Sequence, residues 1–183
     1  MNRNFLLLLS ISLLLFSCSS TSPDQYFGRA ALSSNLLYGF ASDGFHREFA
    51  SPSEKLVDAS SGKTAPMKRA EVLKTKVDAV EEAYANVKRL KIADDNREML
   101  NASLALYEFV LPVYKNEYQA LANLYDSGAD TSKIAAKERF IVETYAGKFG
   151  QLYDALHAAG KKYATEHGIK VMDVNPAPPE PGQ

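Results

Sequence analysis

The sequence predicts an all-α protein, an elongated antiparallel bundle of three to four long helices with disordered termini. The first observation is a stripe of large side chains that recur at alternating spacings of four and three residues, as on one face of a helix. The second is that similar patterns follow Pro66 and Asp130, with short connections at 92–94 and 127–131 that make neighbouring helices antiparallel. The stripe consists of Leu100, Leu104, Tyr107, Leu111, Tyr114, Tyr118, Leu121 and Tyr125.

Length and charge describe one ordinary globular domain. The 183 residues suffice for a single sizeable core. The formal net charge is −1, so no excess of positive charge favours nucleic acid or an anionic membrane surface as a partner. The sequence therefore predicts no nucleic-acid-binding function.

Shifts in composition divide the chain into six segments. A basic start and an apolar run open it, a polar stretch interrupts the helical part, and prolines close it. The predicted segments are a lipoprotein signal peptide at 1–17, a lipidated cysteine and tether at 18–23, an N-terminal helical segment at 24–49, a surface loop at 50–65, the long-helix bundle at 66–168 and an extended Pro-rich tail at 169–183.

The N-terminal helical segment is predicted to hold one helix from Asp24 to about Phe40, a turn at Asp43-Gly44 and one further helical turn. The segment that follows carries Pro52, four serines and only two strongly apolar residues. Such a composition is typical of a loop that runs over the surface of a protein.

Local signals indicate where the first two long helices begin and end. Pro66 suits the first position of a helix, Asp95 with Glu98 three residues later resembles a capping box, and Gly128 supplies a left-handed end. Pro112 lies inside the stripe and is expected to bend its helix, because proline cannot donate the helical hydrogen bond.

The last long helix is predicted to start at Asp130 or Thr131 and to end before Gly168. Three glycines lie inside it, although glycine is a poor helix former. They are therefore expected to mark positions where another helix approaches closely. These glycines are Gly147, Gly150 and Gly160.

The first 18 residues carry the most specific signal in the chain. An apolar run of about 12 residues from Phe5 to Phe16 is too short to span a membrane but suits a signal peptide. The sequence Leu15-Phe16-Ser17-Cys18 then resembles a bacterial lipobox, although Phe16 is larger than the usual residue. The resemblance implies cleavage before Cys18 and acylation of this only cysteine, with two or three chains for a durable anchor. We therefore expect a protein anchored to the bacterial envelope, at the outer membrane.

Two pairs with the pattern Asp-x-x-His are the candidates for a metal site. Helical di-iron proteins place Glu-x-x-His at this spacing and add a glutamate from each facing helix. Because both pairs carry Asp and a glycine interrupts the first, ordinary surface pairs are the favoured interpretation, and no metal site is predicted. The pairs are Asp43 with His46 and Asp154 with His157, and the facing glutamates would be Glu108 or Glu143.

The sequence predicts no enzymatic activity and no cofactor. It lacks the serine motif of α/β-hydrolases, the haem-attachment motif and the phosphate-binding loop of nucleotide-binding proteins. The only thiol, on Cys18, is expected to carry lipid.

The tyrosines of the stripe have two interpretations. Tyrosine at such spacing is more often part of the core, with its hydroxyl reaching water or a partner group. Alternatively, part of the row lines a cleft near Pro112 and binds a ligand or a protein, because tyrosine is enriched at interfaces. The candidates for partner binding are Tyr107, Tyr114, Tyr118 and Tyr125.

The overall plan resembles that of the small helical surface lipoproteins of spirochaetes, in particular the ErpY-like leptospiral lipoproteins. The resemblance lies in the lipobox, the serine-rich tether and the helical runs at 102–128 and 145–168. It implies exposure at the cell surface and binding of host proteins, and it assigns no binding residues.

The leading functional hypothesis is a non-enzymatic, lipid-anchored module that binds a protein partner. A small-molecule-binding or metal-binding helical bundle of the periplasm is the alternative, and it requires a cavity with convergent polar groups. A third possibility is a structural spacer, which requires neither a cavity nor an exposed apolar patch.

Overall fold

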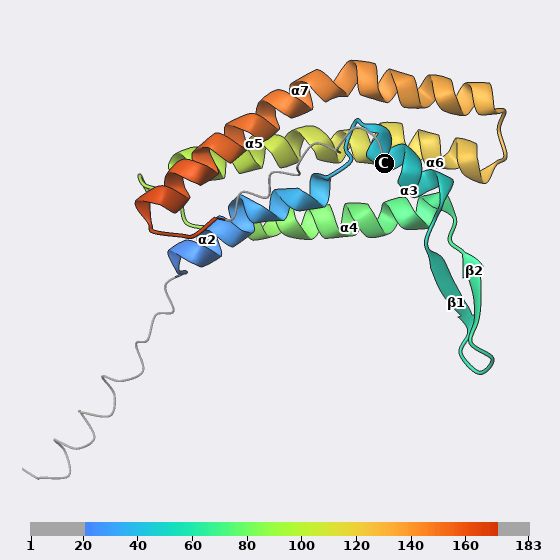
Figure 1. The fold of residues 1–183 in the computed structure, drawn as a ribbon, viewed down its shortest axis with the longest axis horizontal. Helices are drawn as coiled ribbons and strands as arrows, with labels where there is room; N and C mark the ends of the chain where they lie inside the picture. Colours follow the sequence, from blue (N-terminus) through green and yellow to red (C-terminus); the bar gives the residue numbers. More distant parts are fainter. Residues whose placement is uncertain (1–20, 172–183) are drawn as a thin grey trace, which may run out of the picture.

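The computed structural model describes residues 21–171, which form a predominantly helical protein with one two-stranded sheet (Figure 1). The predicted signal peptide, the acylation site and the Pro-rich tail from residue 172 lie outside the described residues. In chain order the elements are α2 (Pro23–Ala30), the 3-10 helix η1 (Leu32–Leu37), α3 (Asp43–Ala50), β1 (Glu54–Asp58), β2 (Lys63–Pro66), α4 (Arg69–Lys88), α5 (Arg97–Val113), the π-helical turn η2 (Tyr114–Tyr118), α6 (Gln119–Asp126) and α7 (Thr131–Glu166).

Three long helical segments pack side by side. α4 leads away from the β1–β2 hairpin, and the continuous segment α5–η2–α6 returns toward it. α7 then runs back along these segments in a curve (Figure 1). α5 contacts α7 and α4, α6 contacts α4 and α7, and α2 packs against α4, α5 and α7. The stripe predicted from the sequence lies on α5–η2–α6, and this segment contacts both α4 and α7, so the apolar side chains of the stripe are covered by these two helices.

Five aromatic side chains from separate parts of the chain form a cluster that we call the aromatic centre. All five are at most 2% exposed, and Phe45 packs on Tyr118 with 4.1 Å between ring centroids. Phe40 makes an edge contact with Tyr114 at 5.3 Å, and Phe45 makes one with Phe49 at 4.9 Å. Burial of five large rings supplies much of the hydrophobic stabilisation at this point. The members are Phe40, Phe45, Phe49, Tyr114 and Tyr118.

The N-terminal segment is not one helix to Phe40, as the sequence predicts, but two short helices. α2 is capped at its N-terminus by Ser22, which forms a capping box with Gln25, and Ala31 is its C-cap residue. The 3-10 helix η1 continues from there, where Ser33 and Ser34 bond to backbone carbonyls of Arg29 and Ala31. These local bonds compete with regular helix.

The prediction of a surface loop at 50–65 is wrong, because most of this stretch forms a β-hairpin. Its antiparallel register pairs Glu54 with Pro66 and Lys55 with Ala65, and a bulge follows Leu56. At the turn, the Asp58 carboxylate accepts three hydrogen bonds from Ser60 and Ser61. The hairpin projects away from the helices, at the end opposite residue 21 (Figure 1).

Helix α4 begins at Arg69 rather than at the predicted Pro66, which ends β2. The backbone N–H groups of Arg69 and Ala70 donate to the two carboxylate oxygens of Asp126, at 2.8 and 3.0 Å. Asp126 lies at the end of α6 and is distant in sequence. Its negative charge complements the helix dipole, so the end of one helix sets the start of another.

The predicted capping box of Asp95 and Glu98 does not form, because Asn96 is the N-cap residue of α5. The buried Asn96 amide instead accepts from the N–H of Ala93 at 2.8 Å and donates to the Lys91 carbonyl at 3.2 Å. Glu98 is left to pair with Lys162 of α7. The connection between α4 and α5 is therefore held by a side chain inside it.

The break expected at Pro112 takes the form of the π-helical turn η2, which begins two residues later. Proline interrupts the hydrogen-bond ladder, and a wider turn is one way to resume it. Both tyrosines of this turn, Tyr114 and Tyr118, belong to the aromatic centre. No helix within residues 21–171 combines the length and the apolar composition that crossing a membrane requires.

The predicted ends of the last two helices are confirmed. Gly128 follows α6 with a φ of +65°, and α7 starts at Thr131 and ends before Gly168. Of the three glycines inside α7, only Gly160 fits the prediction of a close approach, since a Cβ there would lie 3.1 Å from that of Ala31. Gly147 and Gly150 have open space around them, so the prediction is wrong for these two.

Candidate binding sites

Three of the four tyrosines considered for partner binding are core residues. Tyr107, Tyr114 and Tyr118 are at most 2% exposed, so they offer little surface to a partner. The Tyr107 hydroxyl donates to Ser33 at 2.8 Å, and that of Tyr118 accepts from the N–H of Ala41 at 2.7 Å. Burial raises the pKa of the Tyr107 and Tyr118 phenols. Burial therefore supports the core interpretation of these three tyrosines, although Tyr118 also forms part of a cleft.

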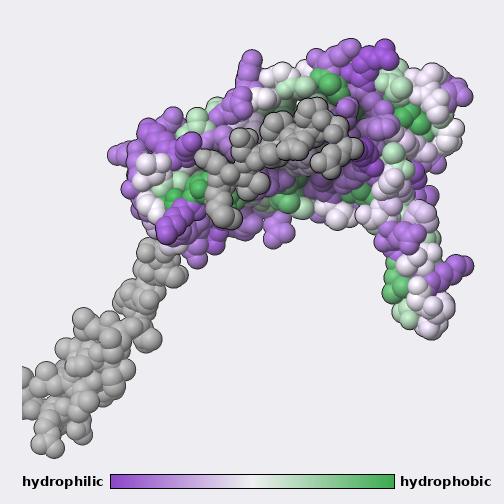
Figure 2. All heavy atoms as spheres, in the orientation of Figure 1, coloured by the Kyte–Doolittle hydropathy of each residue, from purple (hydrophilic) through white to green (hydrophobic). Residues whose placement is uncertain are grey.

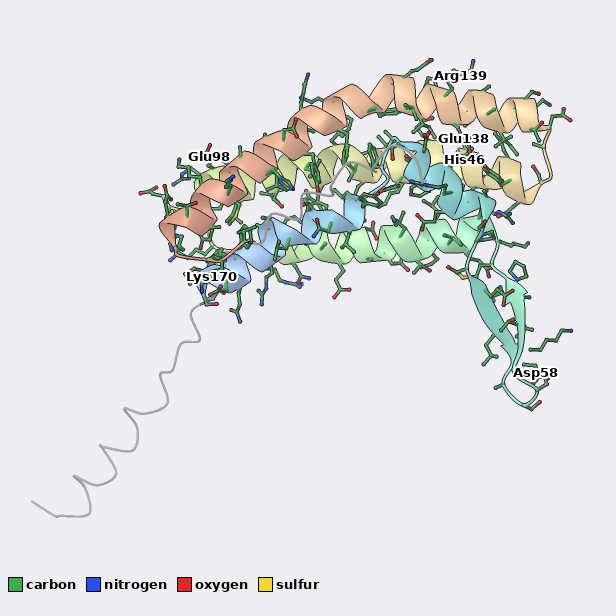
Figure 3. All side chains as sticks on the ribbon, viewed as in Figure 1. His46, Asp58, Glu98, Glu138, Arg139 and Lys170 are labelled. Carbon is green, nitrogen blue, oxygen red and sulfur yellow. The ribbon has the colours of Figure 1, made fainter. Side chains whose placement is uncertain are left out.

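Tyr125, the fourth tyrosine, belongs to a polar network between α3, α6 and α7. Its hydroxyl donates to Oε1 of Glu138 at 2.7 Å, and Nδ1 of His46 lies 2.8 Å from the same oxygen. Figure 3 shows His46 and Glu138 close together between α3 and α7. Burial and the Glu138 carboxylate both raise the pKa of the Tyr125 phenol. This network fixes the position of the carboxylate.

The two Asp-x-x-His pairs have different surroundings. The His46 side chain contacts the carboxylate of Glu138. Asp154 and His157 lie exposed on α7, and the His157 ring packs on that of Tyr153 with 4.7 Å between ring centroids. Within residues 21–171, no group of three or more His, Cys, Asp or Glu side chains is placed to hold a metal ion.

The glutamates considered as facing ligands also separate. Glu108 accepts a hydrogen bond from the Tyr84 hydroxyl at 2.9 Å, away from either histidine pair. Glu143 lies with Asp43 and His46 along one hollow of the surface. Asp43, His46 and Glu143, which were considered as metal ligands, therefore border the same hollow without forming a set of metal ligands.

One hollow of the surface is a groove of about 900 Å³ between the N-terminal helices and the C-terminal half of α7. One wall comes from α2 and η1, the other from α7 and the residues that follow it. Leu32 and Val171, at 50% and 45% exposure, are large apolar side chains in contact with solvent. The apolar lining consists of Phe27, Ala31, Leu32, Tyr153, Leu156, Ala158, Ala164, Ile169 and Val171, with Gly160 among them.

A second hollow is a cleft of about 370 Å³ between α3, the segment η2–α6 and the first half of α7. Its floor consists of four buried side chains, Phe45, Tyr118, Leu121 and Ile141. Its rim carries Asp43, His46, Glu138, Arg139 and Glu143.

A third exposed feature is the hairpin, on which Leu56 and Val57 are 59% and 48% exposed. Figure 2 shows hydrophobic atoms on this projection and, separately, on the helical part of the molecule. Every residue of β1 is exposed, so the hairpin has no contact that buries it.

Comparisons with protein-family models, with curated proteins and with solved structures found no match to this chain. The functional proposal therefore depends on the geometry of these hollows and on the signal peptide that the sequence predicts. The sequence could not indicate the groove or the cleft, because each joins side chains that are more than 70 residues apart in the chain. Of the sequence patterns, only the tyrosine stripe, through Tyr118, and the Asp43–His46 pair include residues that line the cleft.

Proposed function

We propose that the protein is a non-enzymatic binding module that is anchored to the bacterial envelope by acylated Cys18 and binds a protein partner along the groove. We further propose that the helices act as an elongated antiparallel bundle of three to four helices, which holds the groove open. The groove is the observation that carries this proposal.

The lining of the groove favours a protein segment over a soluble metabolite. Its walls are mostly aliphatic and aromatic, and Leu32 and Val171 expose large apolar surfaces at the opening. Exposed apolar surface of this kind is typical of interaction sites. On the α7 wall, the exposed small side chain of Ala158 leaves room for an apolar side chain of the partner.

The position of the groove relative to the leader also bears on the partner. Phe27, on the groove wall, follows Cys18 by only nine residues, which reach at most about 30 Å when fully extended. An acylated Cys18 would therefore keep the groove near the membrane surface. The partner that suits this arrangement is a protein at the same membrane surface, and host proteins are included if that surface faces outward.

A photo-crosslinking amino acid at Asn35, an exposed residue of the groove, tests this proposal in living cells. We expect one discrete protein adduct, and we expect V171D to reduce it by about tenfold, because a buried charge opposes apolar docking. The matched control is L56D, which places the same charge on an exposed apolar site of the hairpin, outside the groove. Loss of the adduct in L56D as much as in V171D, or no adduct at all, would contradict binding in the groove.

A structural spacer is less well supported, because it would need neither the groove nor the exposed apolar side chains that border it. The small-molecule alternative is favoured by one specific observation, the convergence of polar groups on the cleft.

A further inference from the structure

The cleft has an excess of negative charge at its rim. Three carboxylates, those of Asp43, Glu138 and Glu143, face one guanidinium, that of Arg139, and one imidazole. Among the described residues, neither Asp43 nor Glu143 has an ion-pair partner. The negative potential of these groups therefore remains available to attract a cation into a hollow with low-dielectric walls.

One of the three carboxylates, that of Glu138, is fixed in position by two hydrogen-bond partners. The hydroxyl of Tyr125 and Nδ1 of His46 both reach Oε1 of Glu138, at 2.7 and 2.8 Å. The second oxygen, Oε2, is left to accept a hydrogen bond from a bound molecule. The Glu138 side chain is only 19% exposed, and a carboxylate in a partly desolvated position forms a stronger charge-assisted hydrogen bond than one in water.

The same network prepares the imidazole as a second acceptor. A ring nitrogen that lies 2.8 Å from a carboxylate oxygen carries the proton, so in the neutral form of His46 the proton is on Nδ1 and Nε2 is an acceptor. An ammonium group, which has only donors, would find its acceptor on Glu138, whereas Nε2 of His46 faces away from this carboxylate and can accept from a different donor. A carboxylate or a phosphate would face repulsion from the rim.

The floor of the cleft requires an apolar part in the same ligand. Phe45, Tyr118, Leu121 and Ile141 are each 2% exposed and present hydrocarbon to the hollow. The polar end of Tyr118 is already engaged by the backbone of Ala41. A hydrated metal ion would leave this surface uncovered, whereas a ring or short aliphatic chain would fill it. A volume of about 370 Å³ is within the usual range of small-molecule sites.

We propose that this cleft is a binding site for a small organic cation, with its ammonium group on Glu138 and its hydrocarbon part on the apolar floor. The cleft shares no lining residue with the groove, so a negative result for one proposal leaves the other unaffected.

Calorimetric titration of the full chain, purified in detergent, with phenethylammonium tests the proposal. We expect saturable binding that weakens as NaCl is raised, because screening reduces the attraction of the rim. The neutral analogue 2-phenylethanol has the same ring and chain and controls for partition into detergent. Equal binding of the alcohol, or no binding of the cation below about 10 mM, would overturn the proposal.

Variants separate the roles of charge and of shape. We expect E138Q to weaken binding by about tenfold and E143Q by less, since only Glu138 is fixed by two donors. The matched control is E98Q, which removes an exposed carboxylate that pairs with Lys162 outside the cleft and should leave binding unchanged. Binding to E138Q with unchanged affinity would contradict the assignment of the ammonium site.

A further variant tests the cleft without touching its charges. Ala135 is an exposed residue of the lining, and A135L would fill the hollow with little effect on folding. We expect A135L to abolish binding at an unchanged unfolding temperature. If E138Q proved unstable, the result for A135L would still decide the question, because retained affinity in this variant would exclude the cleft.

Discussion

The aromatic centre and the β-hairpin both contain adjacent large apolar residues, but they use them in opposite ways. In the aromatic centre, rings from the N-terminal helices and from η2 enclose one another, and none is more than 2% exposed. In the hairpin, Leu56 and Val57 follow each other in sequence and remain about half exposed. The difference arises because the centre draws on separate segments, whereas an isolated two-stranded hairpin has no second layer to cover it.

This difference implies a division of roles. The free energy of unfolding should depend on the aromatic centre and on the contacts of α5 with α4 and α7, while the hairpin should tolerate change. A substitution in each region, chosen for similar chemistry, can therefore test the comparison.

The largest effect is expected from F45A. Phe45 contacts the rings of Phe49, Tyr114 and Tyr118, so its removal loses hydrophobic burial and leaves a cavity. The expected loss is about 3–5 kcal/mol of unfolding free energy, measured by denaturant titration. In contrast, L56A should change it by less than about 0.5 kcal/mol. A loss of similar size in both variants would refute the division of roles.

A smaller effect, with opposite signs, is expected from two tyrosines of the aromatic centre. Y118F removes the acceptor of the buried N–H of Ala41 and should destabilise the protein by about 1–3 kcal/mol. Y114F removes a buried hydroxyl that has no partner among the described residues, so its stability should rise or stay the same. Thermal unfolding of both variants provides the measurement, and a clear loss in Y114F would show that its hydroxyl is satisfied.

Two glycines of α7 allow the effect of an added methyl group on stability to be compared at a packed and at an open position of the same helix. G147A should stabilise the protein by about 1 kcal/mol, because alanine favours helix and nothing lies within 4 Å of the new Cβ. G160A should gain less or lose stability, since its Cβ would lie 3.1 Å from that of Ala31. Equal gains in unfolding free energy would mean that the packing of α2 on α7 is looser than described.

The smallest effect is expected at the hairpin turn, where hydroxyl bonds from Ser60 and Ser61 lower the pKa of Asp58 from 3.8 to about 2. Since the folded pKa is the lower one, the contribution of the carboxylate is present above pH 4 and is lost as the pH falls toward 2. D58N should therefore speed amide exchange in the hairpin at neutral pH without changing global stability. Unchanged exchange of residues 54–66 would contradict the role of Asp58.

The sequence was sufficient where a signal is local and repeated. The stripe from Leu100 to Tyr125 indicated a helical protein, and Gly128 and Asp130 marked the connection that follows. Burial then explains why Tyr107, Tyr114 and Tyr118 belong to the core. These residues carry their information in spacing or in backbone preference, both of which a single sequence displays.

The sequence was insufficient where a structure depends on distant contacts or lacks a buried face. The hairpin was missed because none of its positions is buried, so no alternation of apolar residues appears. The start of α4 was misplaced because its cap, Asp126, is 57 residues from Arg69. His46 was considered only as half of a pair with Asp43, whereas its hydrogen-bond partner Glu138 lies 92 residues away, where no local motif can indicate it.

The most direct test of the proposed anchored binding module is trypsin treatment of intact cells that produce the native chain or C18A. Lys55 and Lys63 offer exposed cleavage sites in the hairpin, while the helices should resist. We expect the native chain to be membrane-held and cut within the hairpin from outside, and C18A to be released from the membrane. Equal retention of C18A would contradict the lipid anchor. Cleavage only after the envelope is opened would contradict display at the cell surface.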